Sequence, residues 1–85
     1  MSASLQTLHV RFFAILREQA GCATVEVNTD ARDAAALYAE LQQRFPSLIF
    51  SPALLRVSIN ERYAPMDAPL TPNDRVVFIP PVAGG

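Results

Sequence analysis

Five segments of the chain show the alternation of apolar and polar residues that is typical of a β-strand with one buried face. The longest runs from Leu5 to Phe13, and its alternation predicts one face directed into the protein and one directed outward. The inward face carries Leu8, Val10 and Phe12, whereas the outward face carries His9, Arg11 and Phe13. The four shorter segments are Thr24–Asn28, Leu55–Ile59, Arg62–Ala64 and Arg75–Ile79.

Helical spacing replaces this alternation in the middle of the chain. Asp30 is a suitable N-cap, with Asp33 three residues later as a capping-box acid. Pro46 ends the helix, because the residue before a proline leaves the α region. A shorter helix of one or two turns is expected from Ala14 to Ala20, closed by Gly21. The apolar stripe of the long helix must lie against a sheet and consists of Ala34, Leu37, Tyr38, Leu41 and Phe45.

The predicted order of elements is strand, strand, helix, strand, short strand and strand. One long helix on one face of a mixed sheet makes a two-layer α+β domain. We favour the β-grasp arrangement, in which the first and last strands are parallel neighbours at the centre of the sheet, although the pattern alone leaves other strand orders open. Pro80 and Pro81 end the last strand because they offer no N–H to a ladder. We therefore expect a β-grasp domain over residues 1–79 and an extended tail over residues 80–85.

The face of the sheet that the long helix leaves uncovered is expected to carry an apolar patch. Alternation along the first and last strands directs outward Phe13, Val77 and Ile79, with Tyr63 beside them. A contiguous patch of this kind on a small domain usually marks a surface for a protein partner. The alternative is that the connection Ser47–Leu54 of the same chain covers the patch.

Composition and charge exclude several classes of function. The formal net charge of −1 gives no support for nucleic-acid binding, and no apolar stretch approaches the roughly 18 residues that a membrane span needs. The single cysteine, Cys22, excludes an internal disulfide and suits a reducing compartment, so we expect a cytoplasmic protein. All seven cations are arginines, so no lysine of this chain can accept an isopeptide bond.

Catalysis by side chains has little support in the sequence. His9 is the only histidine and lies within a strand, so neither a catalytic triad nor a metal cluster can be built around it. Cys22 follows Gly21 in a loop without an obvious activating group. The eight acids are dispersed, and three glycines do not make a phosphate-binding loop. We therefore expect no metal site and no tightly bound cofactor.

The segment after the last strand is the one unusual chemical feature that remains. Six extended residues span about 20 Å, enough to carry the end of the chain away from the domain. Its tip is Gly84-Gly85, which is thin enough to enter a narrow tunnel of another protein. We expect the reactive group to be the carboxylate of Gly85, which is ionised and unreactive until it is activated, for example as a mixed anhydride with AMP. The alternative is an ordinary chain end, because glycine is frequent in such ends and a glycine pair alone is weak evidence.

Several motifs together resemble the small subunits of molybdopterin synthase, a family of ubiquitin-like sulfur-carrier proteins. The resemblance covers Leu5 to Gly85, and the ending Pro-Pro-Val-Ala-Gly-Gly is its most specific part. The departures are Asn73, where the family often has glycine, and Ala83, where threonine is also common. The matching segments are Val10–Ala14, Leu16–Glu18, Ile59–Glu61, Pro69–Thr71, Asp74–Val76 and Phe78–Gly85.

This resemblance implies a reaction sequence at Gly85. A ubiquitin-E1-like enzyme would use ATP to adenylate Gly85, and a sulfur donor protein would convert the acyl-adenylate to a thiocarboxylate. The tail would then enter the large subunit of the synthase, in a heterotetramer, and donate sulfur to cyclic pyranopterin monophosphate to build the dithiolene of molybdopterin. The inserted residues would be Pro80, Pro81, Val82, Ala83 and Gly84. The family's hydrophobic docking surface would correspond to Phe13, Tyr63 and Ile79, which agrees with the outward patch, Val77 included.

Two other functions remain open at this point. One is the same carrier chemistry in another pathway, such as thiamin or cysteine synthesis. The other is a ubiquitin-like binding module or protein modifier without a catalytic role.

Overall fold

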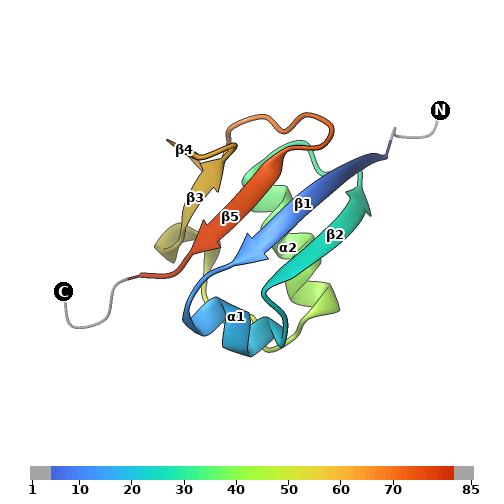
Figure 1. Ribbon diagram of the computed structural model, residues 1–85. Coiled ribbons are helices and arrows are strands. Elements are labelled where there is room, and N and C mark those ends of the chain that lie inside the picture. The colour runs from blue at the N-terminus through green and yellow to red at the C-terminus, as the bar shows by residue number, and fades with distance from the viewer. Residues whose placement is uncertain (1–4, 82–85) are drawn as a thin grey trace.

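The computed structural model describes residues 5–81, which form one five-stranded sheet and two α-helices (Figure 1). The strands follow the order β2-β1-β5-β3-β4 across the sheet. The long helix α2 lies behind the sheet, while the short helix α1 lies at the end of β1 (Figure 1). In chain order the elements are β1 Gln6–Phe12, α1 Ile15–Ala20, β2 Thr24–Thr29, α2 Ala34–Arg44, the 3-10 helix η1 Pro52–Leu54, β3 Arg56–Ile59, β4 Arg62–Ala64 and β5 Arg75–Ile79.

The first and last strands are parallel neighbours at the centre of the sheet. In this pair Val10 lies opposite Val76, and Phe12 lies opposite Phe78. Every other pairing, β1 with β2, β3 with β5 and β3 with β4, is antiparallel. The mixed sheet with one main helix on one face confirms the β-grasp prediction.

The core forms between the sheet and α2, as the two periodicities predict. Tyr38 and Phe78 pack with their ring centroids 5.2 Å apart, and Phe12 meets the ring of Phe45 edge-on at 5.9 Å. Tyr38 is fully buried, its hydroxyl lacks a hydrogen-bond partner among the described residues, and burial raises its pKa. The fully or nearly fully buried residues of this layer include Leu8, Val10, Phe12, Ala34, Leu37, Tyr38, Leu41, Val57, Val76 and Phe78.

The start of α2 differs from the prediction, because the N-cap is Asp33 and not Asp30. The Asp33 carboxylate accepts a hydrogen bond of 2.8 Å from the N–H of Ala36. Residues 30–33 stay outside the helix because tertiary contacts hold this segment: Ala31 is buried and donates its N–H to the Thr29 hydroxyl, and Asp33 is extended and forms a β-bridge with Pro69. Both acids are good capping residues, so the sequence did not distinguish between them.

A buried carboxylate, Asp74, joins the β3–β4 turn to the connection between β4 and β5, at the end of the sheet where β5 begins. It accepts hydrogen bonds from the side-chain amide of Asn60 at 2.8 Å, and from the N–H and hydroxyl of Thr71 at 2.8 and 2.9 Å. Burial alone raises the pKa of Asp74, but these hydrogen bonds and the charge of Arg75 outweigh it and hold the pKa below its ordinary value. Asp74 therefore stabilises the fold in its ionised form.

We expect Asp74→Asn to lower the free energy of unfolding by about 1–3 kcal/mol at pH 7. The asparagine amide has only one oxygen, so it cannot accept all the hydrogen bonds that Asn60 and Thr71 donate to the carboxylate. The folded-state pKa lies below the unfolded value of about 3.9, so the contribution of the carboxylate is complete well above pH 4 and is lost as the pH falls through the folded-state pKa. Urea unfolding at several pH values measures this. The difference in the free energy of unfolding between wild type and variant should become smaller in acid. A difference that does not change with pH contradicts a stabilising role for the ionised Asp74 carboxylate. Asp67→Asn, in an exposed turn, is the matched control.

Candidate functional site

The backbone leaves the sheet at the end of β5 and enters the segment for which the sequence predicts the chemistry. Pro80 is buried and Pro81 is exposed. Because β5 is held between β1 and β3 and Pro80 is buried, the direction in which residues 80–81 leave the sheet is fixed. The predicted tail residues Val82, Ala83, Gly84 and Gly85 lie outside the described residues, and their roles stay predictions.

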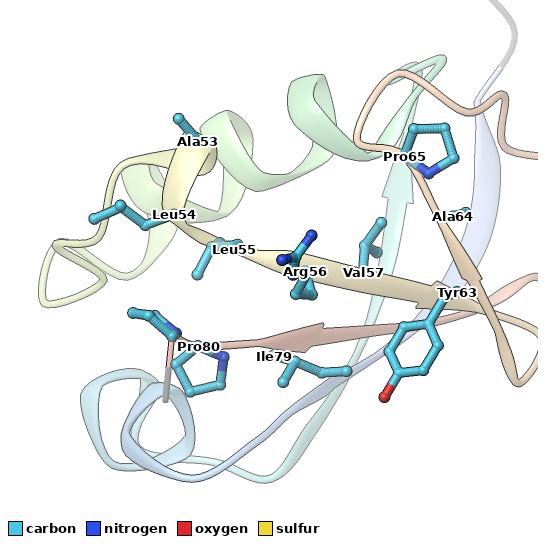
Figure 2. A pocket seen from close by; sticks show the side chains of 11 residues that line it. Ala53, Leu54, Leu55, Arg56, Val57, Tyr63, Ala64, Pro65, Ile79 and Pro80 are labelled. Carbon is cyan, nitrogen blue, oxygen red and sulfur yellow. The ribbon is translucent and has the colours of Figure 1, made fainter. Parts of the chain in front are cut away.

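A groove of about 1020 Å³ opens beside this exit (Figure 2). Its lining comes from η1 and β3, from β4 on one side of β3, and from the end of β5 on the other side. Figure 2 shows Ile79 and Pro80 along one edge, with the Tyr63 ring directed toward the same side. The lining is mainly apolar and consists of Ala53, Leu54, Leu55, Arg56, Val57, Tyr63, Ala64, Pro65, Ile79, Pro80 and Pro81.

The structure brings two of the four predicted docking residues into this groove. Tyr63 is 81% exposed and lines it together with Ile79. Val77 lies instead in a second hollow of about 500 Å³, lined mainly by β1, β2 and β5. Phe13 is 52% exposed and lines neither hollow. The four predicted docking residues thus do not form one closed cluster: two lie in the groove, one in the second hollow and one in neither.

The connection before β3 does not cover the predicted patch, because Tyr63 and Phe13 remain exposed. Its last turn, η1, instead contributes Leu54, which is 55% exposed, to the wall of the groove. Sequence reasoning missed Leu54 because it lies in a segment without periodicity. It also missed Arg56, although alternation along β3 places that residue on the outward face.

A tight turn with an unusual backbone presents Phe13. Ala14 has φ 52° and ψ −126°, and the N–H of Leu16 donates to the carbonyl oxygen of Phe13 at 3.0 Å. These angles match the first central position of a type II′ turn, which glycine usually occupies. Because Leu16 is fully buried, packing holds the turn and leaves Phe13 at the surface.

The described residues 5–81 contain no group of three or more His, Cys, Asp or Glu side chains that could hold a metal ion. The Nδ1 atom of His9 lies 3.4 Å from an Oε2 atom of Glu26 on the neighbouring strand, and both side chains are largely exposed. Cys22 is half-buried and packs against the core.

Within the described residues 5–81 no helix is long and apolar enough to cross a membrane.

A β-grasp domain with an apolar groove at the exit of a Gly-Gly segment is the architecture of ubiquitin-like carrier proteins, as the resemblance of the sequence also implies. The chain belongs to the ThiS family, whose model matches residues 10–85. It is 34% identical over 80 residues to the molybdopterin synthase sulfur carrier subunit of Escherichia coli, with 92% of this chain and 99% of the relative covered. The corresponding subunit of Haemophilus influenzae is 32% identical over 80 residues, with the same coverage.

The fold is also similar to that of a solved archaeal protein. The crystal structure of SAMP1 from Haloferax volcanii matches with a TM-score of 0.77 and 26% identity, covering 93% of this chain and 99% of that one. These comparisons confirm both the β-grasp fold and the resemblance to the sulfur-carrier family.

Proposed function

We propose that this protein is the sulfur-carrier subunit of a molybdopterin synthase in the biosynthesis of the molybdenum cofactor. The observation that carries the proposal is the family match, which continues through Gly85, together with curated relatives named as this subunit over nearly their whole length. The groove beside the exit of the C-terminal segment supports it, because a carrier needs a docking surface close to the group that it delivers.

The reacting group in this proposal is the carboxyl carbon of Gly85. An activating enzyme transfers AMP from ATP to the Gly85 carboxylate and releases pyrophosphate, which converts an unreactive anion into an electrophile. A sulfur nucleophile then displaces AMP and leaves a thiocarboxylate. The thiocarboxylate sulfur attacks cyclic pyranopterin monophosphate, so that a carbon–sulfur bond replaces a carbon–oxygen bond of the precursor. Water then cleaves the bond between the sulfur and the Gly85 acyl carbon, which leaves the sulfur on the product and returns the Gly85 carboxylate. This chain thus acts as a covalent carrier, with ATP bound by its partner and no cofactor of its own.

The length of the segment after β5 suits this division of labour. Residues 80–85 reach about 20 Å when extended, so a partner that docks on the groove can receive the segment in a deep pocket. In this proposal Pro80 to Gly84 form the inserted stem, and the residues that bind the precursor belong to the large subunit. Tyr63 and Ile79 in the groove, with Phe13 and Val77 beside it, contact that subunit.

The partners are part of the same proposal. A solved complex of subunits 1 and 2 of the molybdopterin-converting factor from Helicobacter pylori has a chain with the same fold, at a TM-score of 0.63 and 23% identity. We expect the corresponding large subunit here, in a heterotetramer, together with an E1-like adenylating enzyme and a sulfur donor protein. A cytoplasmic location follows from this set of partners and from the free thiol of Cys22.

A second candidate, a ubiquitin-like modifier, is favoured by the likeness to SAMP1, whose name is that of a small archaeal modifier protein. Affinity purification from the native host, with a tag at the N-terminus so that Gly85 stays free, distinguishes the two. The synthase assignment predicts a stoichiometric large subunit in the eluate and molybdopterin formation when precursor is added. Recovery of isopeptide-linked target proteins alone, or of a partner from thiamin or cysteine synthesis, contradicts it.

A further inference from the structure

Two exposed arginines on the outer face of the sheet have no acidic partner. Arg11 lies on β1 and Arg56 on β3, and within residues 5–81 no ion pair or side-chain hydrogen bond involves either guanidinium. The two acids on the same face contact other side chains, and neither contacts Arg11 or Arg56. Glu26 lies beside His9, and an Oε2 atom of Glu61 lies 3.7 Å from an Nη2 atom of Arg75. Arg11, Arg56 and Arg75 outnumber Glu26 and Glu61, so this face carries an excess of positive charge although the chain has a net charge of −1.

Both arginines lie next to the apolar residues of β5. In the register of the sheet Arg56 lies opposite Ile79, and Arg11 lies opposite Val77. Side chains of such directly paired residues are neighbours on one face of a sheet. Arg56 also lines the groove, where it projects from β3 between Leu55 and Val57 (Figure 2). The docking face thus has an apolar strip along β5 with a guanidinium on each side.

We propose that the large subunit presents carboxylates to Arg11 and Arg56, and that these two charge pairs steer docking and select the partner. This inference rests on the proposed function, in which the groove receives that subunit. The apolar strip and the chain's net negative charge favour an acidic protein surface over a nucleic acid, because nucleic-acid-binding domains are basic overall.

The physical role of such pairs is mainly kinetic. Complementary charges at the rim of an interface accelerate encounter and suppress wrong partners, whereas the apolar contacts supply most of the lifetime of the complex. Guanidinium groups suit this role because they pair with carboxylates through two parallel hydrogen bonds. Salt weakens the steering, since the Debye length falls from about 30 Å at 0.01 M to about 10 Å at 0.1 M.

The test is stopped-flow association of the full-length chain with its purified large subunit at several salt concentrations. The variants are Arg11→Glu, Arg56→Glu and the double variant, and circular dichroism confirms that each is folded. We expect the double variant to associate about 10- to 100-fold more slowly than the wild type at low salt, with the difference shrinking as salt rises. Arg56→Lys keeps the charge and should retain most of the association rate.

Arg32→Glu is the matched control, because it makes the same charge change at an exposed position in the connection before α2. The control should leave the association rate within about twofold of the wild type. Equal slowing by Arg32→Glu and Arg56→Glu, or wild-type association that does not depend on salt, overturns the proposal. Failure of the proposed function looks different, because the large subunit then fails to bind the wild-type chain at any salt concentration.

Discussion

Deletion of Gly85, or addition of one residue after it, is expected to abolish sulfur transfer while the domain stays folded. One residue shifts the reacting carbon by about 3.5 Å along an extended chain. A displacement of only about 1 Å in an active site can cost a hundredfold in rate, so we expect the loss to exceed about 10²-fold. The measurement is molybdopterin formation by the reconstituted synthase, starting from chain that has passed through the activating enzyme and the sulfur donor.

A conservative change elsewhere in the segment is the control for this prediction. Ala83→Ser leaves the length of the chain and the position of Gly85 unchanged, so its sulfur transfer should stay close to that of the wild type. Binding of the large subunit should survive in all three variants, because the groove is intact. Sulfur transfer by the Gly85 deletion at a rate near the wild type contradicts the role of that carboxyl group.

Ile79→Ser is expected to weaken binding of the large subunit by at least about 30-fold, which corresponds to the loss of roughly 2 kcal/mol at a central interface contact. Ile79 lines the groove next to Pro80, on the outward face of β5, and is only half-buried in the free domain. Serine removes the apolar contact with a partner but leaves the inward residues Val76 and Phe78 in place. Isothermal titration calorimetry with the purified large subunit measures the effect.

Ile49→Ser is the matched control, because Ile49 is 74% exposed and does not line the groove. It should leave the affinity within about twofold of the wild type, as most exposed positions outside a hot spot do. Phe13→Ser tests how far the docking surface extends beyond the groove. If Ile79→Ser unfolds the domain, the residue belongs to the core; if it stays folded and binds normally, the groove is not the docking site.

The sheet and the long helix were predictable because local periodicity and global packing agree in them. The inward residues of β1 and β5 alternate strictly, and the stripe that contains Leu37 and Tyr38 follows helical spacing. Each pattern therefore defines a single apolar face that the fold can bury. The N-cap was not predictable, because the choice between Asp30 and Asp33 depends on the burial of Ala31 and on the bridge to Pro69. Those contacts come from the tertiary structure.

The candidate site was predictable in part for the same reason. Alternation placed Ile79 on the outward face, with Tyr63 expected as a neighbour, but the wall that contains Leu54 comes from a connection whose path no periodic pattern specifies. The Asp74 network also joins residues 14 positions apart, Asn60 and Asp74, through side-chain geometry that appears only after folding. Sequence patterns therefore identified the strands of the site, and packing determined the shape of the groove.

The most direct test of a carrier role for Gly85 is the intact mass of the chain, with its native C-terminus, after incubation with ATP, the activating enzyme and a sulfur source. Replacement of one carboxyl oxygen by sulfur adds about 16 Da, and fragmentation should locate the gain on Gly85. The gain should disappear when ATP is omitted. An unchanged mass, or isopeptide adducts alone, contradicts the assignment of this chain as a sulfur carrier.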